Sequence, residues 1–106
     1  MNDQAIVITT TSDTKVTLES ITARLLAERL AACVQISGPV QSWYSWQGET
    51  ECSREWQCVI KTMACHFEAV EQVISSLHHY EVPQIVSFEI TRISTSYLQW
   101  INDSIN

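Results

Sequence analysis

The sequence has little glycine, little proline and few basic residues. Two glycines and two prolines among 106 residues, with a hydrophobic fraction of 45%, argue against long disordered or low-complexity segments. Six lysines and arginines stand against twelve acidic residues, which gives a formal net charge of −6. No positive field is therefore available to attract the phosphate backbone of a nucleic acid, and a nucleic-acid partner is not expected.

Long apolar runs are also missing. No uninterrupted apolar stretch approaches the roughly 20 residues that a membrane-spanning helix needs. The start, MNDQAIVITT, carries no basic segment of the kind that opens a signal peptide. We therefore expect a cytoplasmic protein without a membrane span, folded as one domain over residues 1–106.

The four cysteines form neither CxxC pairs nor a dense disulfide framework. In a cytoplasmic chain we expect them to be reduced. Cys33 and Cys58 lie within apolar patterns, where a thiol behaves as a small hydrophobic group. Cys52 and Cys65 lie near predicted turns, where exposure is expected.

Hydrophobic periodicity predicts four strands and three helices. Leu18, Ile21 and Leu25 are spaced by three and four as on one helix face, whereas Val86 and Phe88 alternate with polar residues as on a strand with one buried face. The predicted elements are a strand over residues 4–10, a helix over 15–32, a strand over 33–46 interrupted at Gly38 and Pro39, a turn around Gly48, a strand over 56–61, a helix over 66–77, a strand over 86–91 and a short helix over 96–102.

This order of elements matches the split βαβ arrangement of ferredoxin-like folds. We predict an α+β fold, ferredoxin-like βαββαβ with a short C-terminal helix, in which right-handed crossovers place both long helices on one face of an antiparallel sheet. The other face is then bare. The hairpin adds exposed aromatic candidates, which are Trp43, Tyr44, Trp46 and Trp56. An uncovered face and aromatic side chains of this kind need a partner surface, and the simplest partner is another copy of the chain. We therefore predict a homo-oligomer.

The segment LHHYEVPQI, residues 77–85, combines groups suited to metal or acid–base chemistry. Histidine titrates near neutral pH and is the commonest metal ligand, so His78 and His79 beside Glu81 favour a functional site. A structural role is equally open, because histidines complement the negative end of a helix and the bond preceding Pro83 ends one.

Five segments, in order, resemble the CutA-type divalent cation tolerance proteins over nearly the whole chain. They are LAERLAACVQI (26–36), SWYSWQGE (42–49), EWQCVIKT (55–62), HHYEVPQI (78–85) and YLQW (97–100). The resemblance implies a tight homotrimer, similar in architecture to PII signalling proteins, in which the hairpins reach across to neighbouring subunits. It also implies intersubunit clefts that contain Cys33, Tyr44, Trp46, Glu55, Lys61, His78, Tyr80 and Pro83.

The metal that the resemblance implies is copper or another divalent cation, with His78 and His79 as candidate ligands. His79 departs from the family pattern, which has proline there in most members. The resemblance credits relatives with three copper ligands, one cysteine and a pair of histidines. These align with Thr9, Leu77 and His78, so only His78 is retained as a ligand type. Successive helical side chains are ~100° apart, and a full site therefore needs a neighbouring subunit.

Two functions remain open at this point. The first is a metal-responsive trimer that serves divalent cation tolerance. The second is a PII-like small-ligand or partner-sensing module, with polar contacts from Glu55, Lys61, His78 and Tyr80 and no specific metal site. An enzyme is not expected, because the sequence has no nucleophile elbow, phosphate-binding glycine loop or zinc-hydrolase motif. Cys33 is read as a core residue rather than a nucleophile.

Overall fold

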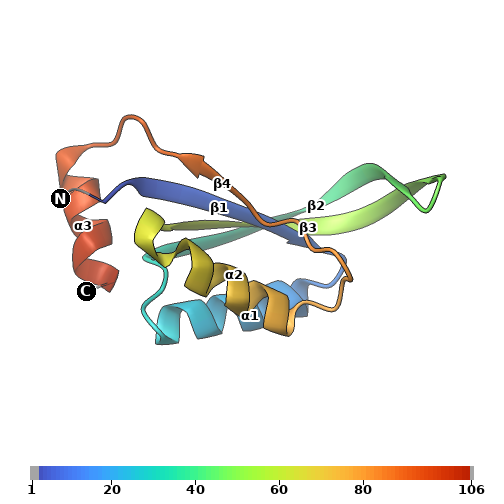
Figure 1. Ribbon diagram of the computed structural model, residues 1–106, viewed down its shortest axis with the longest axis horizontal. Helices are drawn as coiled ribbons and strands as arrows, with labels where there is room; N and C mark the ends of the chain where they lie inside the picture. Colours follow the sequence, from blue (N-terminus) through green and yellow to red (C-terminus); the bar gives the residue numbers. More distant parts are fainter. Residues whose placement is uncertain (1–2, 106) are drawn as a thin grey trace.

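A computed structural model describes residues 3–105 as a four-stranded sheet covered on one face by two helices (Figure 1). The elements are β1 (Ala5–Ser12), α1 (Lys15–Ala27), β2 (Cys33–Trp46), β3 (Glu49–Met63), the 3-10 turn η1 (Ala64–His66), α2 (Phe67–Leu77), β4 (Val86–Glu89) and α3 (Thr95–Ile105). All neighbouring strands are antiparallel, in the order β2-β3-β1-β4. The predicted α+β class, antiparallel sheet and C-terminal helix are confirmed.

The core lies between the sheet and helices α1 and α2. Ile8 of β1 is paired with Ile60 of β3, and both side chains are fully buried against residues such as Leu18 of α1 and Ile74 of α2. Fully burying such a side chain contributes roughly 1.5–3 kcal/mol. The apolar spacing of three and four that predicted the helices is therefore the spacing of their buried faces.

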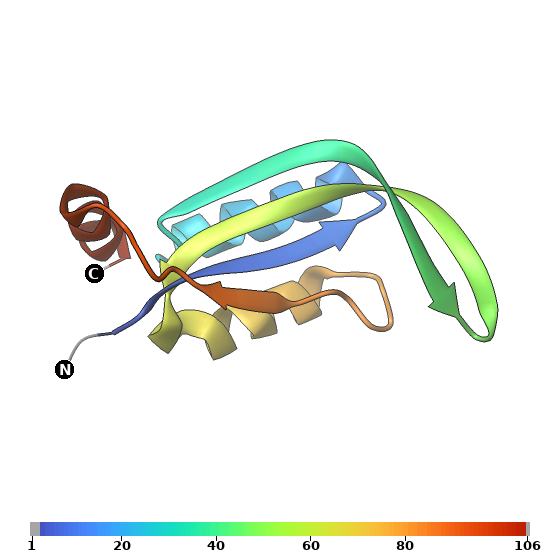
Figure 2. The ribbon, with the colours of Figure 1, turned by 90° about the horizontal axis from the view of Figure 1, so that it is seen from above.

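Helices α1 and α2 leave the opposite face of the sheet open, apart from the end where α3 packs against Ala5 and Met63 (Figure 2). Val86 and Phe88 of β4 are paired with Thr9 and Val7 of β1, on the side away from Ile8. Phe88 is 59% exposed and Val86 42% exposed, so the prediction that this strand buries an apolar face is wrong within one chain. Strand alternation explains the error, since it identifies a face without saying which side the helices occupy.

Helix α1 ends at Ala27, five residues before the predicted end. Arg29 has a positive φ of 57°, so the backbone at this residue is no longer helical. Three residues later, the backbone N–H of Ala32 donates to the carbonyl oxygen of Lys61 at 2.9 Å. The residues between Ala27 and Cys33 therefore form the connection from α1 to β2 instead of a further helical turn. A second core cluster, built from Ile101 and Ile105 with residues of β1 and β3, attaches α3 to this end of the sheet.

The β2–β3 hairpin is long, bent and projects beyond the helices (Figures 1 and 2). The register shifts between Ser37 and Val40, where sequence analysis placed an interruption. Gly38 has φ of 137°, and a Cβ there would lie 3.1 Å from the carbonyl oxygen of Glu55. Glycine is required at this bend because of both the backbone angle and the close approach. The predicted turn around Gly48 is confirmed.

No helix within residues 3–105 is long and apolar enough to cross a membrane.

Candidate functional site

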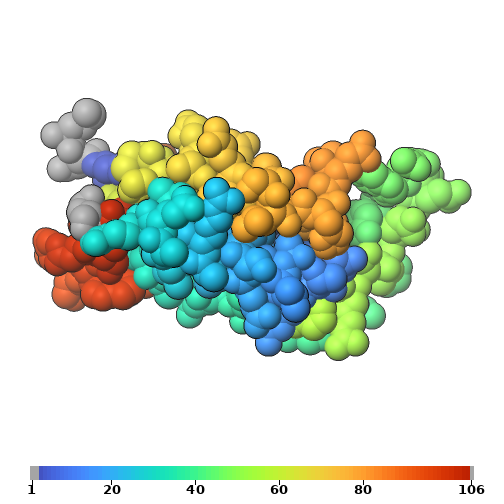
Figure 3. All heavy atoms as spheres, turned by 90° about the horizontal axis from the view of Figure 1, so that it is seen from below, coloured from blue at the N-terminus to red at the C-terminus, as the bar shows by residue number. Residues whose placement is uncertain are grey.

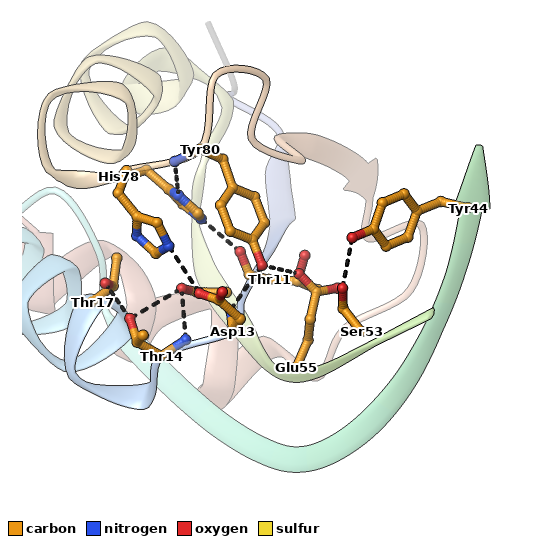
Figure 4. Close-up of polar contacts among 11 residues, drawn as sticks. Thr11, Asp13, Thr14, Thr17, Tyr44, Ser53, Glu55, His78 and Tyr80 are labelled. Atoms are coloured by element: carbon orange, nitrogen blue, oxygen red, sulfur yellow. Dashed lines mark hydrogen bonds and ion pairs between the residues drawn. The ribbon is translucent and has the colours of Figure 1, made fainter. Parts of the chain in front are cut away.

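The loop between α2 and β4 is fastened to β1 by His78 (Figure 4). His78 is buried, and its Nε2 lies 2.7 Å from the carbonyl oxygen of Thr11. The backbone N–H of Tyr80 donates to its Nδ1 at 3.2 Å. A carbonyl can only accept and an N–H can only donate, so the ring is the neutral tautomer with its proton on Nε2. Both ring nitrogens are thus used within the chain.

His79 makes a different and more exposed contact. Its Nε2 lies 2.8 Å from Oδ1 of Asp13, and each side chain is 48% exposed. The two histidine rings stack with centroids 5.4 Å apart. The predicted ~100° separation does not apply, because α2 ends at Leu77, before both histidines. The rings are close, yet their nitrogens contact different partners.

Tyr80 connects the loop to β3. Its hydroxyl donates to Oε2 of Glu55 at 2.6 Å and accepts the backbone N–H of Asp13 at 2.9 Å (Figure 4). Burial of the phenol, followed by the hydrogen bond to Glu55 and the charge of Glu55, raises the pKa of Tyr80 above its ordinary value near 10. Tyr80 is therefore a neutral donor at physiological pH, and it orients the Glu55 carboxylate.

A pocket of about 510 Å³ lies between this loop and the bent hairpin. Its lining residues are Thr11, Ser42, Trp43, Tyr44, Trp46, Glu55, Tyr80, Glu81 and Gln84. The hydroxyl of Tyr44 lies 2.6 Å from Oγ of Ser53 on the neighbouring strand, which ties the two hairpin strands together. Figure 3 shows the outer part of the hairpin projecting past the α2–β4 loop. The pocket thus combines aromatic walls with the carboxylate of Glu55, a residue that is only 5% exposed.

The predicted cleft residues fall into two groups within one chain. Four of them line the pocket, namely Tyr44, Trp46, Glu55 and Tyr80. Cys33 and Lys61 pair with each other where the β2–β3 ladder begins, and Lys61 Nζ lies 5.6 Å from the centre of the Tyr97 ring. His78 fixes the loop, in which Pro83 is half-buried. A single cleft containing all eight residues stays a prediction about an assembly.

Sequence reasoning missed Thr11 and Asp13. Each contacts the α2–β4 loop, from positions 67 and 66 residues earlier than its histidine partner. Both follow the first predicted strand, residues 4–10. In a ferredoxin-like order of elements, the loop after the second helix returns to this end of that strand. That topology was the signal that could have identified them.

The cysteines have the environments expected of free thiols. Cys58 is fully buried, and burial raises the pKa of its thiol to about 11. Cys33 is half-buried and belongs to neither core cluster, so the prediction that it is a core residue is wrong within one chain, whereas Cys52 and Cys65 are exposed as predicted. Cys33 lies at the other end of the hairpin from the pocket, so it is not paired with His78 as a nucleophile with its base.

The residues implied by resemblance do not assemble a copper site in one chain. Within residues 3–105, no three histidine, cysteine or acidic side chains gather as an ion site. Thr9 accepts a hydrogen bond from Gln84 at 3.1 Å, Leu77 has no donor atom, and both nitrogens of His78 are engaged. His79 and Asp13 remain as an exposed pair of side chains whose nitrogen and oxygen atoms are suitable metal ligands.

Comparisons with known proteins agree on one family. A family model described as CutA1 divalent ion tolerance protein matches residues 5–104. The divalent-cation tolerance protein CutA of Citrobacter koseri is 33% identical over 102 residues, which cover 96% of this chain and 89% of that protein. The crystal structure of CutA from Xylella fastidiosa has 35% identity and a TM-score of 0.93, and covers 97% of this chain and 99% of its own.

A further solved relative is named a periplasmic divalent cation tolerance protein CutA, from Archaeoglobus fulgidus. It has 31% identity and a TM-score of 0.92, and covers 96% of this chain and 99% of its own. These similarities extend over the whole fold, including the projecting hairpin.

Proposed function

The chain belongs to the CutA1 family of divalent ion tolerance proteins, and we propose that it serves divalent cation tolerance as a non-enzymatic homotrimer. The observation that carries the assembly is the uncovered sheet face. Phe88 and Val86 are exposed there, and Trp43 is 69% exposed on the hairpin. An exposed apolar surface of this kind marks an interface, and copies of the same chain are its simplest partner.

The shape of the chain supports the same assembly. Its principal extents are 46 × 26 × 22 Å, and the hairpin accounts for the projection along the longest axis (Figure 1). An isolated two-stranded hairpin is marginally stable in water. We propose that neighbouring subunits support it. Light scattering tests the assembly directly.

We propose that any direct metal contact uses His79 and Asp13, with further donors from a neighbouring subunit. The pair is exposed and its two donor atoms are 2.8 Å apart, so an ion would have to replace their mutual contact. Copper or another divalent cation suits an imidazole with a carboxylate. His78 is the less suitable ligand because it would have to release Thr11 or Tyr80.

Calorimetric titration with Cu(II) and Zn(II) tests this part of the proposal. His79→Ala should weaken binding, whereas His66→Ala, which removes a histidine on η1, should leave it unchanged. Isotherms unchanged in both His78→Ala and His79→Ala would remove both histidines from metal binding.

The pocket supports a second candidate function, a PII-like small-ligand or partner-sensing module without a specific metal site. Its volume of about 510 Å³ falls within the range of small-molecule sites. A molecule that binds the native state raises the melting temperature by mass action, so thermal-shift screening tests this function. We propose a cytoplasmic location for either function, which cell fractionation tests.

A further inference from the structure

We propose that the pocket beside Glu55 binds a small organic cation, either a protonated amine or a quaternary ammonium group. Glu55 is its counter-ion, and Tyr44 and Trp46 form the walls that contact it. This inference rests on the small-ligand function proposed above and specifies the ligand's chemical class. It depends on three properties of the pocket, namely the charge of its lining residues, their aromatic side chains and its volume.

The charge at the floor of the pocket is unbalanced. Glu55 is only 5% exposed, and one carboxylate oxygen accepts the Tyr80 hydroxyl. Within residues 3–105, its other oxygen has no hydrogen-bond partner and the carboxylate has no ion pair. Among the described residues, this oxygen is not one of the fully buried polar atoms that lack a partner, so a ligand in the pocket can reach it. Glu81 adds a second negative charge, and no lysine or arginine is among the lining residues.

The carboxylate is held in position before any ligand arrives. Tyr80 donates to Oε2 of Glu55, and Tyr80 is itself fixed by the backbone N–H of Asp13 and by its own N–H on His78. The remaining oxygen of Glu55 is therefore the acceptor offered to a ligand. Such preorganisation reduces the ordering cost of binding.

The aromatic walls favour an organic cation over an inorganic one. Within one chain, Tyr44 is 44% exposed and Trp46 is 40% exposed, so the chain's own packing leaves part of each ring uncovered on the pocket wall. Weakly hydrated ammonium groups are attracted to aromatic faces, and quaternary ammonium groups are the best-known ligands of aromatic cages. A divalent metal instead requires several oxygen, nitrogen or sulfur ligands, while the lining has only two carboxylates and neither histidine nor cysteine. The volume also fits a molecule rather than a single ion.

Titration with choline, followed by tryptophan fluorescence and calorimetry of the intact protein, tests the proposal. The matched neutral ligand is 3,3-dimethylbutan-1-ol, which has the same shape without the charge. Choline should bind at least tenfold more tightly than the alcohol. Glu55→Gln should weaken choline binding at least tenfold, and Trp46→Leu should weaken it severalfold.

The matched control is Glu19→Gln on the exposed surface of α1, which makes the same change in net charge outside the pocket and should bind choline like the parent. Circular dichroism identifies a variant that fails to fold, and Trp46→Leu then provides the second test. Equal binding of choline and the alcohol would overturn the cation assignment and leave the small-ligand function standing. If the protein bound Cu(II) or Zn(II) but neither choline nor the alcohol, both the cation assignment and the small-ligand function would be overturned. A changed assembly mass in Glu55→Gln would also overturn the assignment, because the pocket would then belong to a subunit contact.

Discussion

The two faces of the sheet use the same strands for different purposes. On one face, Ile8 and Ile60 are fully buried beneath the helices. On the other, Val86 and Phe88 are exposed, and the hairpin carries its aromatic residues beyond the domain. The larger core cluster lies on the helix-covered face, whereas the other face contributes Ala5 and Met63 to the small cluster under α3. The rest of that face and the hairpin carry the exposed apolar residues on which the proposed assembly depends.

The largest effect is expected on the helix-covered face. Ile60→Ala removes a fully buried side chain and leaves a cavity, so the free energy of unfolding should fall by about 2–5 kcal/mol. Urea unfolding measures the loss. Val86→Ala, on the open face, is the control and should cost less. A smaller loss for Ile60→Ala than for Val86→Ala would contradict the assignment of the two faces.

A charge on the hairpin should act on assembly rather than on the core. Trp43 is 69% exposed in one chain, and Trp43→Asp is expected either to dissociate the oligomer or to give insoluble protein. Light scattering and a solubility assay measure the outcome. An unchanged assembly mass would contradict a role of the hairpin in the interface.

Tyr80→Phe probes the loop between α2 and β4, which Tyr80 connects to β3. It leaves Oε2 of Glu55 without its donor, which should cost about 1–3 kcal/mol at neutral pH. Since the pKa of Tyr80 is raised by folding, the unfolded chain loses the phenol proton first, at pH near 10. The stabilisation is therefore complete below pH ~10 and decreases as pH rises further.

The measurement is thermal unfolding of parent and Tyr80→Phe at neutral pH and above pH ~10. The difference in melting temperature between them should narrow at the higher pH. A difference that stays constant would show that Tyr80 ionises alike in the folded and unfolded chains.

The smallest effect is expected from the exposed histidine. His79→Ala removes a pair that is half exposed, so stability should change by about 1 kcal/mol or less. His78→Ala should cost more, because the carbonyl of Thr11 and the N–H of Tyr80 lose their partner. Chemical denaturation compares the two variants. A larger loss for His79→Ala would reverse the roles assigned to the two histidines.

Hydrophobic periodicity predicted most helices and strands because the spacing of apolar residues follows the local geometry of each element. The spacing of Leu18, Ile21 and Leu25 predicted α1, and Gly48 predicted the hairpin turn. The end of α1 was missed because it depends on a bond from Ala32 to Lys61 across the sheet. Periodicity also left the side faced by Phe88 undetermined, since alternation is the same on either face.

The candidate site was predicted less completely than the fold. Family resemblance predicted Glu55 and Tyr80 as site residues, but it did not predict the hydrogen bond between them, which joins positions 25 residues apart. The buried role of His78 depends on Thr11, which no spacing in the sequence brings near it. Contacts of this kind depend on how the loop returns over β1.

The most direct test of the account is the mass of the native protein in light scattering, compared with that of Phe88→Asp. We expect a trimer of about 36 kDa, from three chains of 12.1 kDa each, and a smaller species when a charge is placed on the open face. A monomer of the parent protein, or a Phe88→Asp variant with the parent's mass, would contradict the claim that this face is an interface between copies.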